Sequence, residues 1–517
     1  MASSLARNSV ANGIAGFATT LGGVLSTVII ARVLGVEGTG VVAFAVWVVT
    51  FALLTAEMGI PSTLTRYVSS TAASGGENTP QGVATSLYTP FAISNAVVAI
   101  AFFAYAAWLA FAYSQPFWHI DASNYRTAPL FWALIAAATL AQAFANFTNG
   151  YLRGIGEFRK LSTIAVVSAT IQVATALIGA WLFGIAGAMT GAVLGFIIPA
   201  AMAHNIASPS AAIDPALKQR IMRYAIESWF GFIVAAFAWS RMEIFFLERS
   251  FGSEAVGLFT SALTLSNIVT QGPMLLTGAL IPFLARQAAL DDRDKLRTSY
   301  AMVLRLFALA VAPACFGLAA ISKTLLPMIF GQSFAPAVPS AMILLIAAAV
   351  TYSGSISTLY LLALEKTRVV LLFASLGAVL VVAAGLTIIP AYGPIGAAVS
   401  RSLIQLAVVS AGLWYAARYL DAPPPLLSLA RIFLAAAGSG LVAYGVSGAI
   451  GGVSGIAVAI LVAIAAYALL LKVFGALPPD DAAELERTAS LLPKPLDAWM
   501  RTAIAWIAAH PPAQPLL

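Results

Sequence analysis

Arg32-Val-Leu-Gly-Val-Glu-Gly-Thr-Gly40 is echoed 217 residues later by Arg249-Ser-Phe-Gly-Ser-Glu-Ala-Val-Gly257, so the pattern R-x-x-G-x-E-x-x-G occurs twice. Each copy joins two long apolar runs. A second set of residues repeats at an offset of 209, and its pairs are Tyr151 and Tyr360, Arg159 and Arg368, Gly184 and Gly393, and Gly187 and Gly396. The Ile60-Pro61 dipeptide is matched by Ile281-Pro282. Six helices are therefore expected to correspond to six later ones, in the same order and orientation.

The composition indicates that lipid surrounds most of the chain. Of its 517 residues, 61% are hydrophobic and only 9% are charged, and the mean hydropathy is +0.92. An ordinary soluble protein is about 25% charged, so a soluble multidomain protein is excluded. The single cysteine, Cys315, excludes an internal disulfide framework, and the three histidines follow no metal-ligand spacing. We expect no metal, no prosthetic group and no nucleic-acid partner.

Fourteen apolar runs are long enough to cross a bilayer. They are 9–31, 39–60, 83–113, 127–150, 162–183, 185–204, 221–247, 254–281, 298–320, 340–362, 369–389, 394–417, 427–446 and 451–474. With the N-terminus in the cytoplasm, 20 of the 27 lysines and arginines lie on the cytoplasmic side, four lie outside and three lie within spans. This excess predicts that both termini are cytoplasmic.

The repeat and the spans predict an all-α polytopic membrane protein in four parts. Residues 1–205 form an N-lobe of six spans, and residues 206–420 form a C-lobe of six. Residues 421–475 hold two further spans. Residues 476–517 form a cytoplasmic tail in which apolar residues at helical spacing from Leu496 to Ile507 predict a helix on the membrane surface.

Two equal parallel halves are typical of transporters that rock about a central site, so we expect a transporter and not an enzyme. Four charges of the repeated motif, Arg32, Glu37, Arg249 and Glu254, lie at helix ends. They are interpreted as loop residues that pair across a glycine turn, and they are also the candidate gating residues.

Several segments resemble bacterial polysaccharide flippases of the Wzx type, within the multidrug/oligosaccharidyl-lipid/polysaccharide (MOP) exporter superfamily. They are Ala31–Gly40, Glu57-Met-Gly-Ile-Pro61, Gly154-Ile-Gly-Glu-Phe-Arg-Lys160 and Gly184-Ile-Ala-Gly-Ala188. The resemblance implies a monomeric transporter in the bacterial inner membrane. It would carry an undecaprenyl-pyrophosphate-linked oligosaccharide from the inner to the outer leaflet by alternating access. Whether a proton gradient or a sodium gradient supplies the energy is left open. The expected partners are the substrate and membrane lipid, and polysaccharide polymerase machinery is left open as a further partner.

Ionisable groups inside a span are costly and by default face a cavity. Arg241, Arg305 and Arg401 fall inside spans, and a guanidinium fork suits the phosphate oxygens of a pyrophosphate. Polar residues expected to share that cavity are Asn12, Asn267 and Gln271. Glu57 is the leading acid for coupling to protons or sodium, with an ion pair to Arg66 as the alternative.

Three other functions stay open. A peptidoglycan-precursor flippase belongs to the same superfamily. An exporter of organic cations should have an acidic cavity, whereas the three central charges here are arginines. A membrane glycosyltransferase or polymerase needs a catalytic carboxylate or histidine and usually a large outer loop, and the outer loops are short. The chain has no G-x-x-x-x-G-K loop, so ATP hydrolysis is not intrinsic.

Overall fold

The computed structural model describes residues 2–74, 79–113, 120–206, 213–269, 293–489 and 494–508, and every regular element in these ranges is a helix. Nine helices of this described part are long and apolar enough to cross a membrane. Large apolar side chains such as Phe111, Trp181 and Leu441 are more than two thirds exposed, as expected where lipid is the solvent. The prediction of an all-α multi-pass protein is confirmed, while the count of fourteen and the orientation stay predictions.

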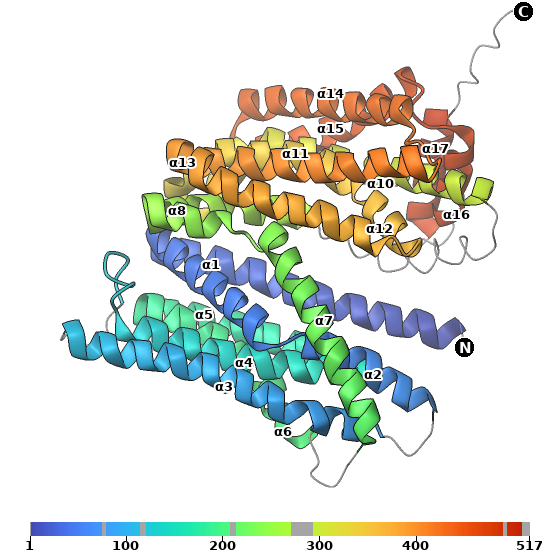
Figure 1. Cartoon of the computed structure of the whole chain (residues 1–517). Coiled ribbons are helices and arrows are strands. Elements are labelled where there is room, and N and C mark those ends of the chain that lie inside the picture. The colour runs from blue at the N-terminus through green and yellow to red at the C-terminus, as the bar shows by residue number, and fades with distance from the viewer. Residues whose placement is uncertain are drawn as a thin grey trace, which may run out of the picture. The chain divides into compact units, whose positions relative to one another are not determined.

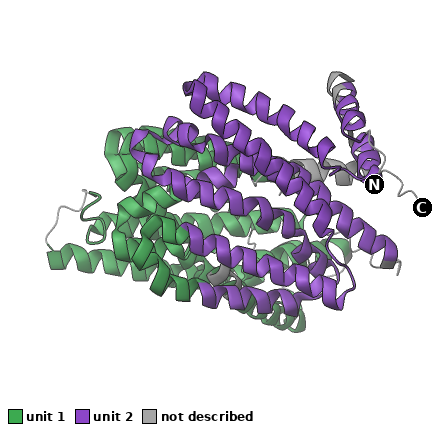
Figure 2. Ribbon diagram, turned by 90° about the horizontal axis from the view of Figure 1, so that it is seen from above, with its two compact units in different colours: residues 1–260, 381–397 green, residues 261–380, 398–517 purple. Residues whose placement is uncertain are grey.

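The chain forms two compact units, coloured separately in Figure 2. The first holds residues 1–260 and 381–397. Its helices are α1 (Ala2–Ala56), α2 (Ile60–Ser74), α3 (Pro80–Tyr113), α4 (Pro129–Gly154), α5 (Phe158–Gly195), α6 (Ile197–Ile206), α7 (Pro215–Trp239), α8 (Glu243–Phe251) and the start of a helix described over 253–269. The middle of α13 (Thr367–Tyr419) also belongs here, and an added Cβ at its Gly385 would lie 2.2 Å from the Phe246 ring of α8.

The second unit holds residues 261–380 and 398–517. Besides most of α13, its helices are α10 (Arg293–Phe330), η1 (Gln332–Ala337), α11 (Val338–Gly354), α12 (Ile356–Ala363), α14 (Leu426–Ile450), α15 (Gly452–Val473), α16 (Pro479–Ala489) and α17 (Lys494–Ala508). Its core lies between α10, α11 and α14, with the Tyr300 and Tyr360 rings stacked 4.4 Å apart.

In three elements two helices meet at a single non-helical glycine, so that each element covers two expected spans. α1 turns at Gly35, α5 at Gly184 and α13 at Gly393, and both α1 and α13 double back on themselves (Figure 1). All three glycines have a positive φ, a conformation that costs glycine little and other residues more. Each expected loop is thus reduced to one residue.

The repeat predicted from the sequence is present in the backbone angles. Gly35 has φ 70° and ψ −167°, and Gly252, its partner at the offset of 217, has φ 78° and ψ −168°. Gly184 has φ 59° and ψ −135°, and Gly393, its partner at the offset of 209, has φ 57° and ψ −136°. The two copies therefore share turns as well as residue types.

The ends of α4 and α12 extend this match to hydrogen bonds. Gly156 and Glu365, which are 209 residues apart, both have positive φ. In each case the following residue donates its N–H to a carbonyl five residues back, from Glu157 to Leu152 at 3.0 Å and from Lys366 to Leu361 at 2.8 Å. This closing bond is typical of a helix that ends in a left-handed residue. The motif is conserved between the copies even where glycine is replaced by glutamate.

The tail after α15 packs on the second unit. Ile504 of α17 is buried beside Ala482 of α16, and Ile507 packs on the cluster that includes Ala476. The Lys472 ammonium lies 4.1 Å from the centre of the Trp506 ring. One face of the predicted surface helix α17 is therefore covered by protein.

Candidate functional site

α1 and α2 are separated by a break at Glu57, Met58 and Gly59. The Glu57 amide donates the last helical bond of α1, to Leu53, and Met58 and Gly59 then take left-handed φ values of 49° and 67°. Pro61 lies in the first turn of α2, where a missing N–H costs nothing. The sequence Glu-Met-Gly-Ile-Pro thus ends one helix and starts the next.

Side chains from three other helices donate hydrogen bonds to the end of α1. The pairs are Trp229 Nε1 of α7 to the Leu54 carbonyl at 2.8 Å, Asn95 Nδ2 of α3 to the Ala56 carbonyl at 3.3 Å, and Asn146 Nδ2 of α4 to Glu57 Oε1 at 2.7 Å. Carbonyls in the last turn of a helix lack intrahelical partners, and two of these bonds supply them. The break is therefore held from three sides.

Gly59 allows α7 to lie directly on this break. A Cβ at Gly59 would come within 2.7 Å of the Ala225 carbonyl oxygen and 3.2 Å of the backbone nitrogen of Trp229. Any side chain here would push the α7 backbone away. The closeness of α7 sets the position of the Trp229 indole.

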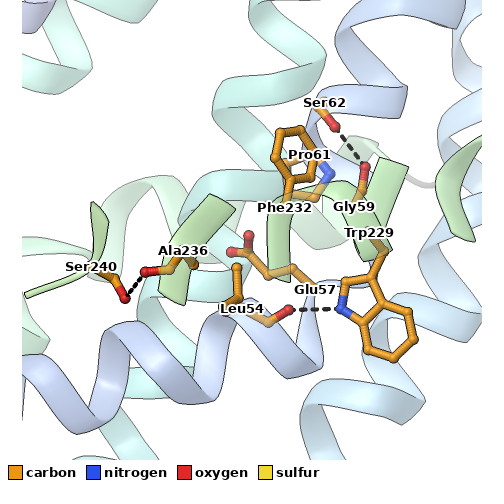
Figure 3. Close-up of a pocket in the computed structure, with 9 residues that line it drawn as sticks. All are labelled: Leu54, Glu57, Gly59, Pro61, Ser62, Trp229, Phe232, Ala236 and Ser240. Atoms are coloured by element: carbon orange, nitrogen blue, oxygen red, sulfur yellow. Dashed lines mark hydrogen bonds between the residues drawn. The ribbon is translucent and has the colours of Figure 1, made fainter. Parts of the chain in front are cut away.

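A cavity of about 540 Å³ opens beside the break (Figure 3). It is lined by Leu54, Glu57, Gly59, Pro61, Ser62, Trp229, Phe232, Ala236 and Ser240. Glu57 is the only ionisable residue in this lining, and Figure 3 shows its carboxyl group projecting toward Phe232 and Ala236. A carboxylate facing a largely apolar cavity is suited to take up a proton or a small cation.

Glu57 is paired with a neutral amide rather than with Arg66. The Arg66 guanidinium lies 4.4 Å from the centre of the Tyr224 ring on α7, and no ion pair joins it to Glu57 in the described residues. The alternative role of Glu57, as the partner of Arg66, is therefore not adopted.

Arg241 lies at a break between α7 and α8. The prediction of one unbroken helix over 221–247 was wrong, because the helix stops at Trp239 and resumes at Glu243. Arg241 is exposed and has a φ of 59°, a conformation that is uncommon for a side chain of this size. Its neighbour Ser240 lines the Glu57 cavity. Broken helices are a common way to build a site in a transporter.

Arg305 has both arms of its guanidinium fork engaged by the tail. Its Nε lies 2.5 Å from Asp481 Oδ2 and its Nη2 lies 2.7 Å from Oδ1. The side chain of Asp481 is 0% exposed and that of Arg305 is 13% exposed. Contact of Arg305 with a substrate stays a prediction, and it requires Asp481 to leave.

The other predicted residues are not among those that line the Glu57 cavity, or they lie outside the described residues. Arg401 on α13 and Asn267 on the 253–269 helix are half-buried. Gln271 and the side chain of Asn12 lie outside the described residues. The motif charges, Arg32, Glu37, Arg249 and Glu254, are all exposed.

No sequence pattern pointed to Asn95, Asn146 or Trp229. The two asparagines carry a signal that could have identified them, since each is a polar amide within a long apolar run. Which carbonyl or carboxylate they would meet depended on helix packing.

Comparison with known proteins assigns the family. A profile described as polysaccharide biosynthesis protein matches residues 29–339. The chain belongs to this family. No curated protein matches the sequence of this family member.

Solved structures share the fold of this polysaccharide biosynthesis protein. The lipid II flippase MurJ, in an inward closed conformation, matches with a TM-score of 0.72 and 14% identity, covering 90% of this chain and 98% of that one. An inward-facing multidrug MATE transporter of the MOP superfamily matches at 0.63 and 14% identity, covering 78% and 95%. A MOP superfamily transporter from Pyrococcus furiosus matches at 0.55 and 15% identity, covering 81% and 96%.

The profile and the long apolar helices make this a multi-pass membrane protein of the polysaccharide biosynthesis family, and its fold is shared with transporters of the MOP superfamily. The inner membrane is the expected location for a bacterial flippase.

Proposed function

We propose that this protein moves an undecaprenyl-pyrophosphate-linked oligosaccharide from the inner to the outer leaflet of the cytoplasmic membrane. The observation that supports it best is the combination of a polysaccharide biosynthesis profile with a fold match over 90% of the chain to a lipid flippase. The match to the multidrug transporter covers 78% of the chain. The larger shared fold favours a lipid-linked substrate over an organic cation.

In this proposal, α7 connects ion binding to substrate binding. α7 contributes Trp229, Phe232, Ala236 and Ser240 to the cavity, and the next residue along the chain is Arg241. Uptake of a proton or sodium ion by Glu57 changes the charge beside α7, to which the end of α1 is bonded through Trp229. A shift of α7 would then move Arg241 relative to the substrate.

The principal phosphate contact in this proposal is Arg241. A guanidinium keeps its charge and can hold two phosphate oxygens at once. Arg241 lies where two half-helices meet, so a small rotation about Ser240–Met242 would redirect it without unwinding either helix. The sugar portion would be held by weaker polar contacts.

The test is a flipping assay with the full chain in proteoliposomes. The probe is a fluorescent undecaprenyl-pyrophosphate-linked oligosaccharide, and its arrival in the far leaflet is read by an impermeant lectin. We expect protein-dependent flipping that responds to an imposed proton or sodium gradient. Lipid II and an organic cation are assayed in parallel. Movement of lipid II alone would assign a peptidoglycan-precursor flippase, and movement of the cation alone would assign a drug exporter.

A further inference from the structure

A buried carboxylate, Glu248, joins α8 to the turn that precedes α4. Its side chain is 7% exposed and accepts a hydrogen bond from the Tyr125 hydroxyl. Arg126 approaches the same oxygen with Nε at 2.6 Å and Nη2 at 2.5 Å, and Nη2 also donates to the Glu248 carbonyl at 2.7 Å. Burial, and then the bond to Glu248, raise the pKa of the Tyr125 phenol, so it stays protonated and donates.

The turn that carries Tyr125 and Arg126 is itself fixed. Thr127 donates its amide to the Asn124 carbonyl at 2.9 Å, and the Asn124 side chain accepts from the Asp121 amide at 3.0 Å. Trp132 Nε1 donates to the Arg126 carbonyl at 2.8 Å. Both partners of Glu248 are therefore presented by a rigid support.

Aromatic rings lie beside this cluster. Trp47 of α1 stacks on Phe245 of α8 with centroids 5.6 Å apart, and Phe44 meets Tyr125 edge-on at 6.1 Å. Phe44 is thirteen residues from Glu57, which at 1.5 Å per residue is about 20 Å along the helix. The Glu248 cluster and the Glu57 cavity are thus separate features.

The repeated motif supplies a third contact at this end. A Cβ at Gly40 would lie 1.7 Å from the Ser253 carbonyl oxygen, and a Cβ at Gly257 would lie 2.1 Å from the Val36 carbonyl oxygen. Gly40 and Gly257, like Val36 and Ser253, are equivalent positions at the offset of 217. The two copies of the motif therefore cross backbone to backbone.

We propose that Tyr125, Arg126 and Glu248 form an ionic latch that closes one end of the transport path and must open in every cycle. The inference rests on the proposed function. α8 and the 253–257 segment belong to the second copy of the repeat, and residues 36–47 and 125–126 belong to the first. When two halves rock about a central site, contacts between them at one end break as that end opens.

The chemistry of the cluster suits reversible opening. The Arg126 side chain is 53% exposed, so water already reaches one partner. On separation, a carboxylate and a guanidinium regain hydration, which offsets much of the lost pairing. A purely apolar seal would gain nothing from water on opening. The latch therefore holds a closed state firmly without preventing its opening.

The decisive experiment locks the latch covalently. Arg126→Cys/Glu248→Cys is linked with a reducible bis-methanethiosulfonate reagent, and flipping of the fluorescent lipid-linked oligosaccharide is measured before and after reduction. The only native cysteine, Cys315, is buried. We expect flipping at least ten times slower when the link is present, with recovery on reduction. A linked protein that flips as fast as the same protein after the link has been reduced would overturn the latch.

A matched control lies within the second unit. Arg297 and Asp421 form an ion pair with the same 2.5 Å separation between Nη2 and a carboxylate oxygen. Arg297→Cys/Asp421→Cys, linked in the same way, should flip at an unchanged rate. If the control pair links and the Arg126/Glu248 pair does not, the latch contact itself is contradicted.

A labelling experiment separates the latch from the proposed function because it needs no substrate. Thr39 is 2% exposed and precedes Gly40 at the crossing. In a Thr39→Cys background, Glu248→Gln should raise the rate of thiol labelling about tenfold, since loss of a charged hydrogen bond favours the open state. Unchanged labelling would refute the latch. If Glu248→Gln increases the labelling but the wild-type protein does not flip the lipid-linked oligosaccharide, the latch stands and the proposed substrate is refuted.

Discussion

The break around Glu57 and the junction around Arg305 each hold a partly buried ionisable group, but they give it different partners. Glu57 faces a cavity and accepts a bond from Asn146, which is neutral. Arg305 is engaged through two bonds by Asp481, which carries the opposite charge. A carboxylate beside a neutral amide becomes neutral when it takes up a proton or cation, whereas neutralising one partner of a closed ion pair leaves the other charge unpaired. Burial alone therefore does not identify a working charge.

The largest expected effect is at the closed pair. Asp481→Asn should leave the buried Arg305 guanidinium without a counter-charge and cost about 3–5 kcal/mol. Thermal unfolding in detergent, together with protease cleavage of the tail, measures this cost. The double variant Arg305→Met/Asp481→Leu should restore most of the stability, because it removes both charges. A single Asp481→Asn variant as stable as wild type would remove the distinction between the two regions.

Arg241 provides the functional counterpart of Arg305. Arg241→Ala should slow flipping about tenfold to a hundredfold, since a hydrogen bond to a charged group is worth roughly 1.5–3 kcal/mol. Because Arg241 is exposed at a helix break, the unfolding temperature should change little. Arg241→Lys should recover part of the rate by keeping the charge without the fork. Unchanged flipping at matched expression would remove Arg241 from the site.

Gly59 tests whether the break must hold α7 in place. Gly59→Ala forces a side chain into a left-handed residue, at about 1–2 kcal/mol, and against the Ala225 carbonyl. We expect a lower unfolding temperature and slower flipping together. Gly156→Ala is the matched control, because that glycine also has positive φ but meets nothing within 4 Å. Equal losses of stability and of flipping in both variants would show that the positive φ, and not the contact with α7, causes the effect.

The smallest expected change in stability is at Glu57 itself. Glu57→Gln keeps an oxygen for Asn146, so the free energy of unfolding should change by less than about 1 kcal/mol. Flipping should lose its response to an imposed proton or sodium gradient, because the amide takes up neither ion. A gradient response that survives in Glu57→Gln, measured in proteoliposomes, would exclude Glu57 as the coupling residue.

The helical class and the repeat could be predicted because they depend on local patterns. Apolar runs give the helices, and Gly35, Gly184, Gly252 and Gly393 mark turns that need a positive φ. Pairings between distant residues were not predictable in this way. Asp481 lies 176 residues from Arg305, and nothing near either residue indicates the other. The break at Arg241 was also missed, because no proline or glycine lies within five residues of it.

The crossing of Gly40 and Gly257 constrains how this chain can have diverged since its two copies arose. A side chain at either position would meet a carbonyl oxygen, and the main chain is common to every amino acid. No second substitution nearby can make room, as a smaller neighbour would for a crowded core residue. Each glycine therefore has to persist in any descendant that keeps this crossing, even after the rest of the two copies has become dissimilar.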